Sequence, residues 1–188
     1  CADELAIEYQ RVDAGGKFGL VDTPDYLAMN PNGLIPVIND DGFVMWESNA
    51  IVRYLSARHG SGSLSPADPQ RRADADRWMD WQATAFNPAI GPAFWHLIRF
   101  PAEQRDAKVI EAARESAEKK LAMLDAHLAN NAFVAGAAFT MGDIPLGCSV
   151  VRWYKLPLTR EVHPHVERWY AALRERKGAR QVVELGLS

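Results

Sequence analysis

The chain has 188 residues, of which 48% are hydrophobic and 24% charged, and its formal net charge at pH 7 is -3. This composition is typical of globular proteins, and the weakly acidic balance gives no reason to expect nucleic acid or an anionic membrane surface as a partner. No apolar run approaches the length of about 20 residues that a membrane-spanning helix needs.

The first residues have the pattern of a helix end followed by a strand. Cys1 to Leu5 is typical of a last helical turn, and residues 7–12 alternate as a strand does. Because a chain rarely starts like this and no initiating Met is present, we expect a preceding strand and most of a first helix to be missing from this sequence. No signal-peptide pattern is visible, so we expect a cytoplasmic protein.

The sequence contains two cysteines, Cys1 and Cys148, which are far apart and form no CxxC pair. This arrangement favours neither a disulfide framework nor a redox motif. We expect both to be buried apolar side chains.

A β-hairpin is predicted next. Two β-rich runs, 34–38 and 43–45, are joined by Asn39-Asp-Asp-Gly42, in which Asp-Gly readily takes the positive φ of a tight turn. Pro36 lies inside the first run, where it indicates an edge strand, a bulge or a cis peptide bond. A short helix is predicted to begin at Ser48.

The stretch from 59 to 66 is rich in glycine and serine, and every later segment has the pattern of helix and turn. We therefore predict a first domain at 1–59, a linker at 60–66 and an all-helical domain at 67–188.

Within this second domain, Asp68-Pro69 is an N-cap with proline at the first helical position, and the helix is predicted to end at Pro88. A long amphipathic helix is predicted over 104–128. Thr140-Met-Gly-Asp143 resembles a capping box, in which the Thr140 hydroxyl accepts from the Asp143 amide and the Asp143 carboxylate reaches back.

The candidate binding site consists of Ile35, Pro36, Glu47 and Ser48. A cis proline would turn the amide and carbonyl of Ile35 outward, where they can pair with an extended peptide. The helix start at Ser48 offers an amide, a hydroxyl and the positive end of the helix dipole to a carboxylate, while Glu47 could receive an ammonium group. Glutathione, with its γ-glutamyl end, is a peptide of this kind.

Each element also has a simpler interpretation, since a lone Ile-Pro is usually an edge device and a lone Glu-Ser a helix cap. Their combination across one hairpin favours the glutathione site.

Five aromatic residues of the helical part could line a second-substrate pocket, although most are expected in the core: Trp78, Trp81, Phe86, Phe94 and Trp95. We predict no metal site, because His163-Pro164-His165 is interpreted as a helix start.

Two sequence blocks, Asn30-Pro-Asn-Gly-Leu-Ile-Pro-Val37 and Trp46-Glu-Ser-Asn-Ala-Ile51, resemble the glutathione S-transferase superfamily, especially its bacterial and theta-like members. The Thr140 block is similar to that family's capping box. The resemblance implies an α+β thioredoxin-like domain, truncated at its start, followed by an all-α domain. It also implies a cis Ile35-Pro36 bond, backbone binding of the cysteinyl part of glutathione by Ile35, and binding of the γ-glutamyl part by Glu47 and Ser48.

By the same resemblance, the chain is a transferase in detoxification that takes glutathione as co-substrate and conjugates its thiolate to a small hydrophobic electrophile. Glutathione-dependent reduction, dehalogenation or isomerisation, or a non-catalytic binding module, remain alternatives on this fold. The family's thiol-activating residue lies in the segment that we expect to be missing, so we assign no catalytic residue.

Two weaker candidates are also implied by the resemblance. Many theta-like members have lysine where this chain has Leu34, and Lys17 could supply that charge to the glycyl carboxylate unless it is a solvated loop residue. Asp76 matches an acid that in some members reaches the γ-glutamyl amine across a dimer, unless it is simply solvated. In the homodimer that the family usually forms, residues 45–58 would pack against residues 71–86 of the partner.

Overall fold

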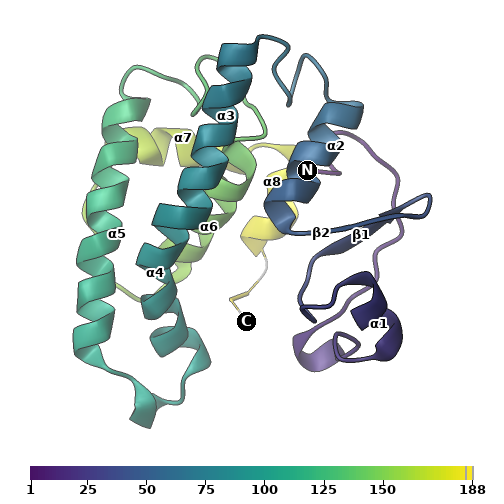
Figure 1. Cartoon of the computed structure of the whole chain (residues 1–188). Coiled ribbons are helices and arrows are strands. Elements are labelled where there is room, and N and C mark those ends of the chain that lie inside the picture. The colour runs from purple at the N-terminus through teal and green to yellow at the C-terminus, as the bar shows by residue number, and fades with distance from the viewer. Residues whose placement is uncertain (185, 188) are drawn as a thin grey trace.

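The computed structural model of the protein describes residues 1–184, 186 and 187. Its first part combines a two-stranded sheet with helices, and its second part is helical (Figure 1). This order confirms the predicted fold class. The predicted domain bounds stay a prediction, and the last of them, 67–188, includes positions 185 and 188, which lie outside the described residues.

The first part contains a short 3-10 turn and two helices beside the hairpin; its elements are η1 (Gly16–Phe18), α1 (Pro24–Met29), β1 (Val37–Asp40), β2 (Phe43–Trp46) and α2 (Ser48–His59). The strands pair antiparallel, with Val37 opposite Trp46 and Asp40 opposite Phe43. The two turn residues, Asp41 and Gly42, have φ values of 52° and 93°. The hairpin and the helix start at Ser48 are therefore confirmed.

The strand predicted at residues 7–12 is wrong. Residues 2–6 form a turn, and residues 7–12 have no regular secondary structure. A strand exists only where its backbone groups have a ladder partner. In the described part of the chain, β1 and β2 pair with each other and no strand lies beside residues 7–12.

The helices of the second part pack around a large apolar core, and a smaller apolar cluster lies between α2 and the first of these helices. The α-helices of this part are α3 (Pro69–Trp81), α4 (Asn87–Phe94), α5 (Ala107–Leu128), α6 (Asp143–Lys155), α7 (Pro164–Arg174) and α8 (Lys177–Glu184). As predicted, α5 buries one face, on which Ala117, Leu121 and Leu124 are fully buried. The fully buried Trp153 of α6 and Trp169 of α7 belong to the same core.

The predicted helix end at Pro88 is wrong, because the helix continues. α3 passes through a π-helical segment, η2 (Gln82–Phe86), into α4, and a second one, η3 (Trp95–Arg99), follows before the 3-10 turn η4 (Ala102–Gln104). The amide of Asn87 bonds to the carbonyl of Gln82, five residues back. This wider turn accommodates Pro88, which has no amide to donate.

Asp143, at the start of α6, is fully buried and accepts four hydrogen bonds. Its Oδ1 accepts from the Val134 amide at 3.0 Å and from Trp169 Nε1 at 2.8 Å, and its Oδ2 accepts from the amide and hydroxyl of Thr140 at 2.9 and 3.2 Å. The carboxylate therefore reaches back as predicted. The other half of the predicted capping box is wrong: the Asp143 amide donates to the Thr140 carbonyl, and the hydroxyl is itself a donor.

Within the described residues, no helix combines the length and the apolar character needed to cross a bilayer.

Candidate functional site

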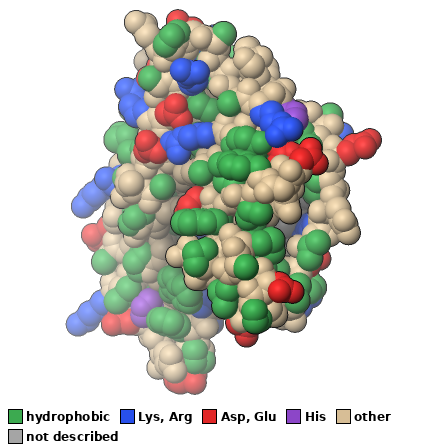
Figure 2. Space-filling model, turned by 45° about the vertical axis from the view of Figure 1, so that its right-hand side comes forward, with side chains coloured by type: hydrophobic (Ala, Val, Ile, Leu, Met, Phe, Trp, Pro, Cys, Tyr) green, Lys and Arg blue, Asp and Glu red, His purple; other side chains and the backbone are tan. Residues whose placement is uncertain are grey.

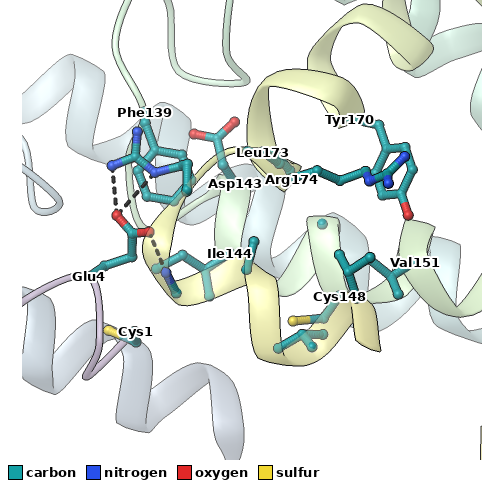
Figure 3. A pocket seen from close by; sticks show the side chains of 16 residues that line it. Cys1, Glu4, Phe139, Asp143, Ile144, Cys148, Val151, Tyr170, Leu173 and Arg174 are labelled. Carbon is teal, nitrogen blue, oxygen red and sulfur yellow. Dashed lines mark hydrogen bonds and ion pairs between the residues drawn. The ribbon is translucent and has the colours of Figure 1, made fainter. Parts of the chain in front are cut away.

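Two of the hollows at the surface of the described chain hold candidate residues, and the one that is larger when its open mouth is included, at about 550 Å³, has an apolar wall. It lies between α6, α7, α8 and the first residues of the chain (Figure 3). Glu4 accepts hydrogen bonds there from Arg176, at 3.0 and 2.6 Å, and from the Gly178 amide at 3.0 Å. The Arg176 guanidinium also lies 3.8 Å from the centre of the Phe139 ring. The main charged groups of this hollow are thus bonded to one another.

Both cysteines contribute to the wall of this larger hollow, and neither is in a disulfide. Cys148 is exposed and Cys1 is half-buried, so the expectation that both are buried is wrong. The cause is the placement of Cys148 on the side of α6 that faces the hollow instead of the core (Figure 3).

The smaller hollow, of about 340 Å³, brings together the four residues predicted to form the binding site. Its lining consists of Asn30, Asn32, Leu34, Ile35, Pro36, Glu47 and Ser48. The Ile35-Pro36 bond is cis, as predicted, and lies directly before β1. The hairpin then returns the chain so that Glu47 and Ser48, which follow β2, face the same hollow.

A buried asparagine holds the loop on one side of this hollow. Asn30 is 2% exposed, and its Nδ2 donates to the Leu34 carbonyl at 2.7 Å. The Tyr26 hydroxyl donates to the same carbonyl at 2.9 Å, and burial raises the pKa of Tyr26. Asn30 Oδ1 accepts from the amide and side chain of Asn32 at 3.1 and 3.0 Å. These contacts position the residue that precedes Ile35.

The backbone amide and carbonyl of Ile35 lie beside this hollow. Among the described residues, neither its amide nor its carbonyl has a hydrogen-bond partner. Its side chain is 59% exposed. A main-chain donor and acceptor at the surface beside a short sheet are the groups to which an extended peptide binds.

The opposite side of the hollow is the N-terminus of α2. Glu47 has φ 72°, a conformation that costs a residue other than glycine about 1 to 3 kcal/mol. In the part of the chain that is described, neither its carboxylate nor the Ser48 hydroxyl has a hydrogen-bond partner. The first amides of α2 have no intrahelical acceptor, so this end of the helix favours an anion.

The two weaker candidates lie elsewhere. Lys17 is exposed in η1, with its Nζ 5.0 Å from the centre of the Phe18 ring, and it is not among the lining residues of the smaller hollow. Asp76, on α3, accepts from Arg53 Nε of α2 at 2.6 Å. Arg53 also bonds to Asp80. Burial lowers the pKa of Arg53 but the two bonds raise it, and the net direction is upward. The roles proposed for Lys17 and Asp76 stay predictions.

Sequence reasoning missed a chain of polar side chains that starts beside Ser48 and crosses into the helical part. Asn49 Nδ2 donates to the Met79 carbonyl at 3.0 Å and to Gln82 Oε1 at 3.2 Å. Gln82, 6% exposed in η2, donates to the Ser149 hydroxyl of α6 at 2.8 Å. That hydroxyl donates to Asn87 Oδ1 at 2.8 Å. This chain couples the start of α2 to α4 and α6.

The smaller hollow offers three binding groups: the Ile35 backbone suits an extended peptide, the Glu47 carboxylate suits an ammonium group, and the helix start at Ser48 suits a carboxylate. One small peptide with a free amine and carboxylate at one end would satisfy all three. The geometry therefore agrees with the ligand that the residue types predict.

Comparison with known proteins agrees with this interpretation. Residues 1–58 match the family described as glutathione S-transferase, N-terminal domain, and residues 107–172 match glutathione S-transferase, C-terminal domain. The chain is 39% identical over 188 residues to glutathione S-transferase GstB of Escherichia coli strain K12, which covers 99% of this chain and 90% of that protein.

Solved structures of glutathione S-transferases are also similar to this chain. A theta class glutathione S-transferase from Xanthomonas axonopodis pv. citri, with glutathione bound, is similar to this chain with a TM-score of 0.95 and 42% identity, and the match covers 100% of this chain and 90% of that one. A second kind of relative is elongation factor 1-gamma 2 of Oryza sativa subsp. japonica, 32% identical over 151 residues, which are 79% of this chain and 36% of that protein.

Proposed function

Because this chain belongs to the glutathione S-transferase family, we propose that it binds glutathione in the smaller hollow and conjugates the thiolate to a hydrophobic electrophile. The observation that carries the proposal is the meeting, in one hollow, of an unpartnered Ile35 backbone with an unpartnered Glu47 and Ser48. A transferase of this kind would act in the cytoplasm, in detoxification.

Each side of the hollow has one task in this proposal. The Ile35 amide and carbonyl bind the cysteinyl backbone of glutathione, and Glu47 and Ser48 bind the γ-glutamyl ammonium and carboxylate. A free thiol has a pKa of about 8.5, so the thiolate must be stabilised at neutral pH. The sulfur then bonds to the electrophilic carbon while the leaving group departs with its electron pair. The residue that stabilises the thiolate is not assigned.

The second substrate, a hydrophobic electrophile, would contact exposed apolar side chains of the protein. Figure 2 shows hydrophobic side chains gathered in patches between charged ones on the face that carries the hairpin. As expected, most of the five aromatic residues are in or against the core, since Trp78 and Phe86 are buried and Trp81 and Phe94 pack on it. Trp95 is 54% exposed, which makes it the member of this set best placed to touch an electrophile.

The alternative of a non-catalytic binding module is favoured by a specific observation, the similarity to elongation factor 1-gamma. Such a protein could keep the hollow without the thiol chemistry. Binding and turnover must therefore be measured separately.

A paired experiment tests the proposal and its alternative. Glutathione binding is measured by calorimetry, and conjugation is measured by absorbance with chlorodinitrobenzene as the electrophile. We expect binding together with turnover that depends on glutathione. Binding without turnover of any aryl or alkyl electrophile would favour the binding module, and absence of binding would contradict the proposed site.

We further propose a homodimer, in which residues 45–58 pack against residues 71–86 of the partner. The exposed Trp46 and the mixed charges of α3 would form an apolar contact with a polar rim. Light scattering at micromolar concentration should give about twice the monomer mass of 20.9 kDa. A monomer that keeps its glutathione affinity would contradict the dimer and the cross-subunit role of Asp76 together.

A further inference from the structure

Far from the smaller hollow, three potential metal ligands meet between α5 and the segment that joins α6 to α7. Glu118, on α5, is 5% exposed, and His163, directly before α7, is 6% exposed. His163 Nε2 lies 2.8 Å from Glu118 Oε2. Glu161 is exposed, and one ligand atom from each of the three residues lies within 4.8 Å of the others. The two buried side chains thus form the inner side of a small cluster, and the exposed Glu161 lies on its solvent side.

The second oxygen of Glu118 is the unusual feature of this cluster. Glu118 Oε1 is buried and has no hydrogen-bond partner among the described residues. A buried carboxylate oxygen without a partner is costly, and an unpaired buried group of this kind often marks an ion or an ordered water. Among the described residues, the buried hydroxyl of Tyr154, on α6, also has no hydrogen-bond partner. Burial, and then the charge of Glu167, raises the pKa of Tyr154 to about 12, and the charge of Glu118 acts in the same direction.

The charges around the cluster leave a negative balance. Arg114, one turn before Glu118, is near both Glu118 and Glu161, and it bonds to Glu111 at 2.7 and 3.0 Å. Three carboxylates, those of Glu111, Glu118 and Glu161, thus share the guanidinium of Arg114. A divalent cation would balance them, and Arg114 is already engaged by Glu111.

We propose that Glu118, Glu161 and His163 bind a divalent transition-metal ion of the zinc type. An imidazole nitrogen with two carboxylates suits zinc better than magnesium or calcium, which prefer oxygen ligands alone. Zinc binds nitrogen and oxygen at about 2.0 to 2.2 Å in a tetrahedral arrangement, so its ligand atoms lie about 3.3 to 3.6 Å apart. The three ligand atoms lie within 4.8 Å of one another, with His163 Nε2 and Glu118 Oε2 2.8 Å apart, and Glu161 lies in irregular backbone, so side-chain adjustments would bring them to these separations.

Such an ion would connect α5 to the start of α7 through side chains that are distant in sequence. Three protein ligands would leave the fourth position open on the exposed side, at Glu161, for water. The ion is expected to stabilise the helical part without touching the glutathione site. The proposal is therefore independent of the proposed function.

The test uses zinc itself as the probe. Full-length protein without a histidine tag is stripped with a chelator, titrated with Zn²⁺ by calorimetry and followed by thermal unfolding. We expect one equivalent to bind and the unfolding temperature to rise. Glu161→Gln, an exposed substitution, should weaken zinc binding by about tenfold or more, since even the partners of metal ligands are worth tenfold to a hundredfold. Glu115→Gln, at an exposed position of α5, is the matched control and should bind zinc as the wild type does.

Three outcomes would overturn the proposal: no zinc-dependent heat or stabilisation, equal affinity in Glu161→Gln and wild type, or equal weakening in the Glu115→Gln control. If zinc bound elsewhere, for example at Cys148, Glu161→Gln and the wild type would have equal affinity, which is the second of these outcomes. Glu118→Gln should also lose zinc binding. Because Glu118 is buried, its result is interpreted only if the circular dichroism spectrum of that variant matches that of the wild type. The Glu161→Gln comparison decides the question in either case.

Discussion

Replacing Glu47 and Ser48 together by alanine should weaken glutathione binding by at least about a hundredfold. Each side chain would lose a charge-assisted hydrogen bond of about 1.5 to 3 kcal/mol, and about 1.4 kcal/mol corresponds to a factor of ten in affinity. Both side chains are exposed and make no hydrogen bond within the described chain, so the fold should not depend on them. Calorimetry with glutathione measures the effect directly.

The matched control for this double variant is Glu115→Ala combined with Ser61→Ala, which removes the same two side chains from exposed positions far from the hollow. Its affinity should equal that of the wild type. If the Glu47 and Ser48 variant also kept wild-type affinity, glutathione would have to bind elsewhere and the proposed site would be abandoned.

Asp143→Ala should strongly destabilise the protein, because several buried hydrogen bonds are lost at once. The carboxylate is fully buried and accepts four hydrogen bonds, from Val134, Thr140 and Trp169. Each buried donor left without an acceptor costs about 1 to 3 kcal/mol, so the free energy of unfolding should fall by about 4 kcal/mol or more. Urea denaturation followed by circular dichroism measures this change.

Asp143→Asn keeps the size of the side chain but turns one acceptor into a donor that faces other donors, so we expect an intermediate loss. Asp143→Asn also tests the prediction if the Asp143→Ala variant does not fold. Asp22→Ala, at an exposed position, is the control and should change the stability by less than about 0.5 kcal/mol. A loss below about 1 kcal/mol for Asp143→Ala would show that the donors find other partners.

Where the sequence pattern was wrong, the missing information was non-local in each case. The alternating residues 7–12 are compatible with a strand, but a strand forms only beside a partner, and none lies there in the described chain. Pro88 is normally a helix end, yet the π-helical turn before it removes the need for its amide. Cys148 follows the apolar pattern of α6, but it lies on the side that faces the larger hollow.

The sequence alone was sufficient to predict that the two sides of the candidate site lie together, because their geometry is local. Asp41-Gly42 specifies a tight turn, the turn specifies the hairpin, and the hairpin places the residues before β1 opposite those after β2. Ile35, Pro36, Glu47 and Ser48 therefore line one hollow for reasons contained in fourteen consecutive residues, 35–48.

Only the tertiary structure could decide the supporting contacts, because each joins helices whose packing depends on the whole core. Asn49 meets Gln82 through the approach of α2 to η2, and Gln82 meets Ser149 through the packing of η2 on α6. Glu118 and His163 are 45 residues apart and share no motif. Their contact depends on how α5 packs against α7, which no periodicity of either segment encodes, and the proposed zinc site could not be found without it.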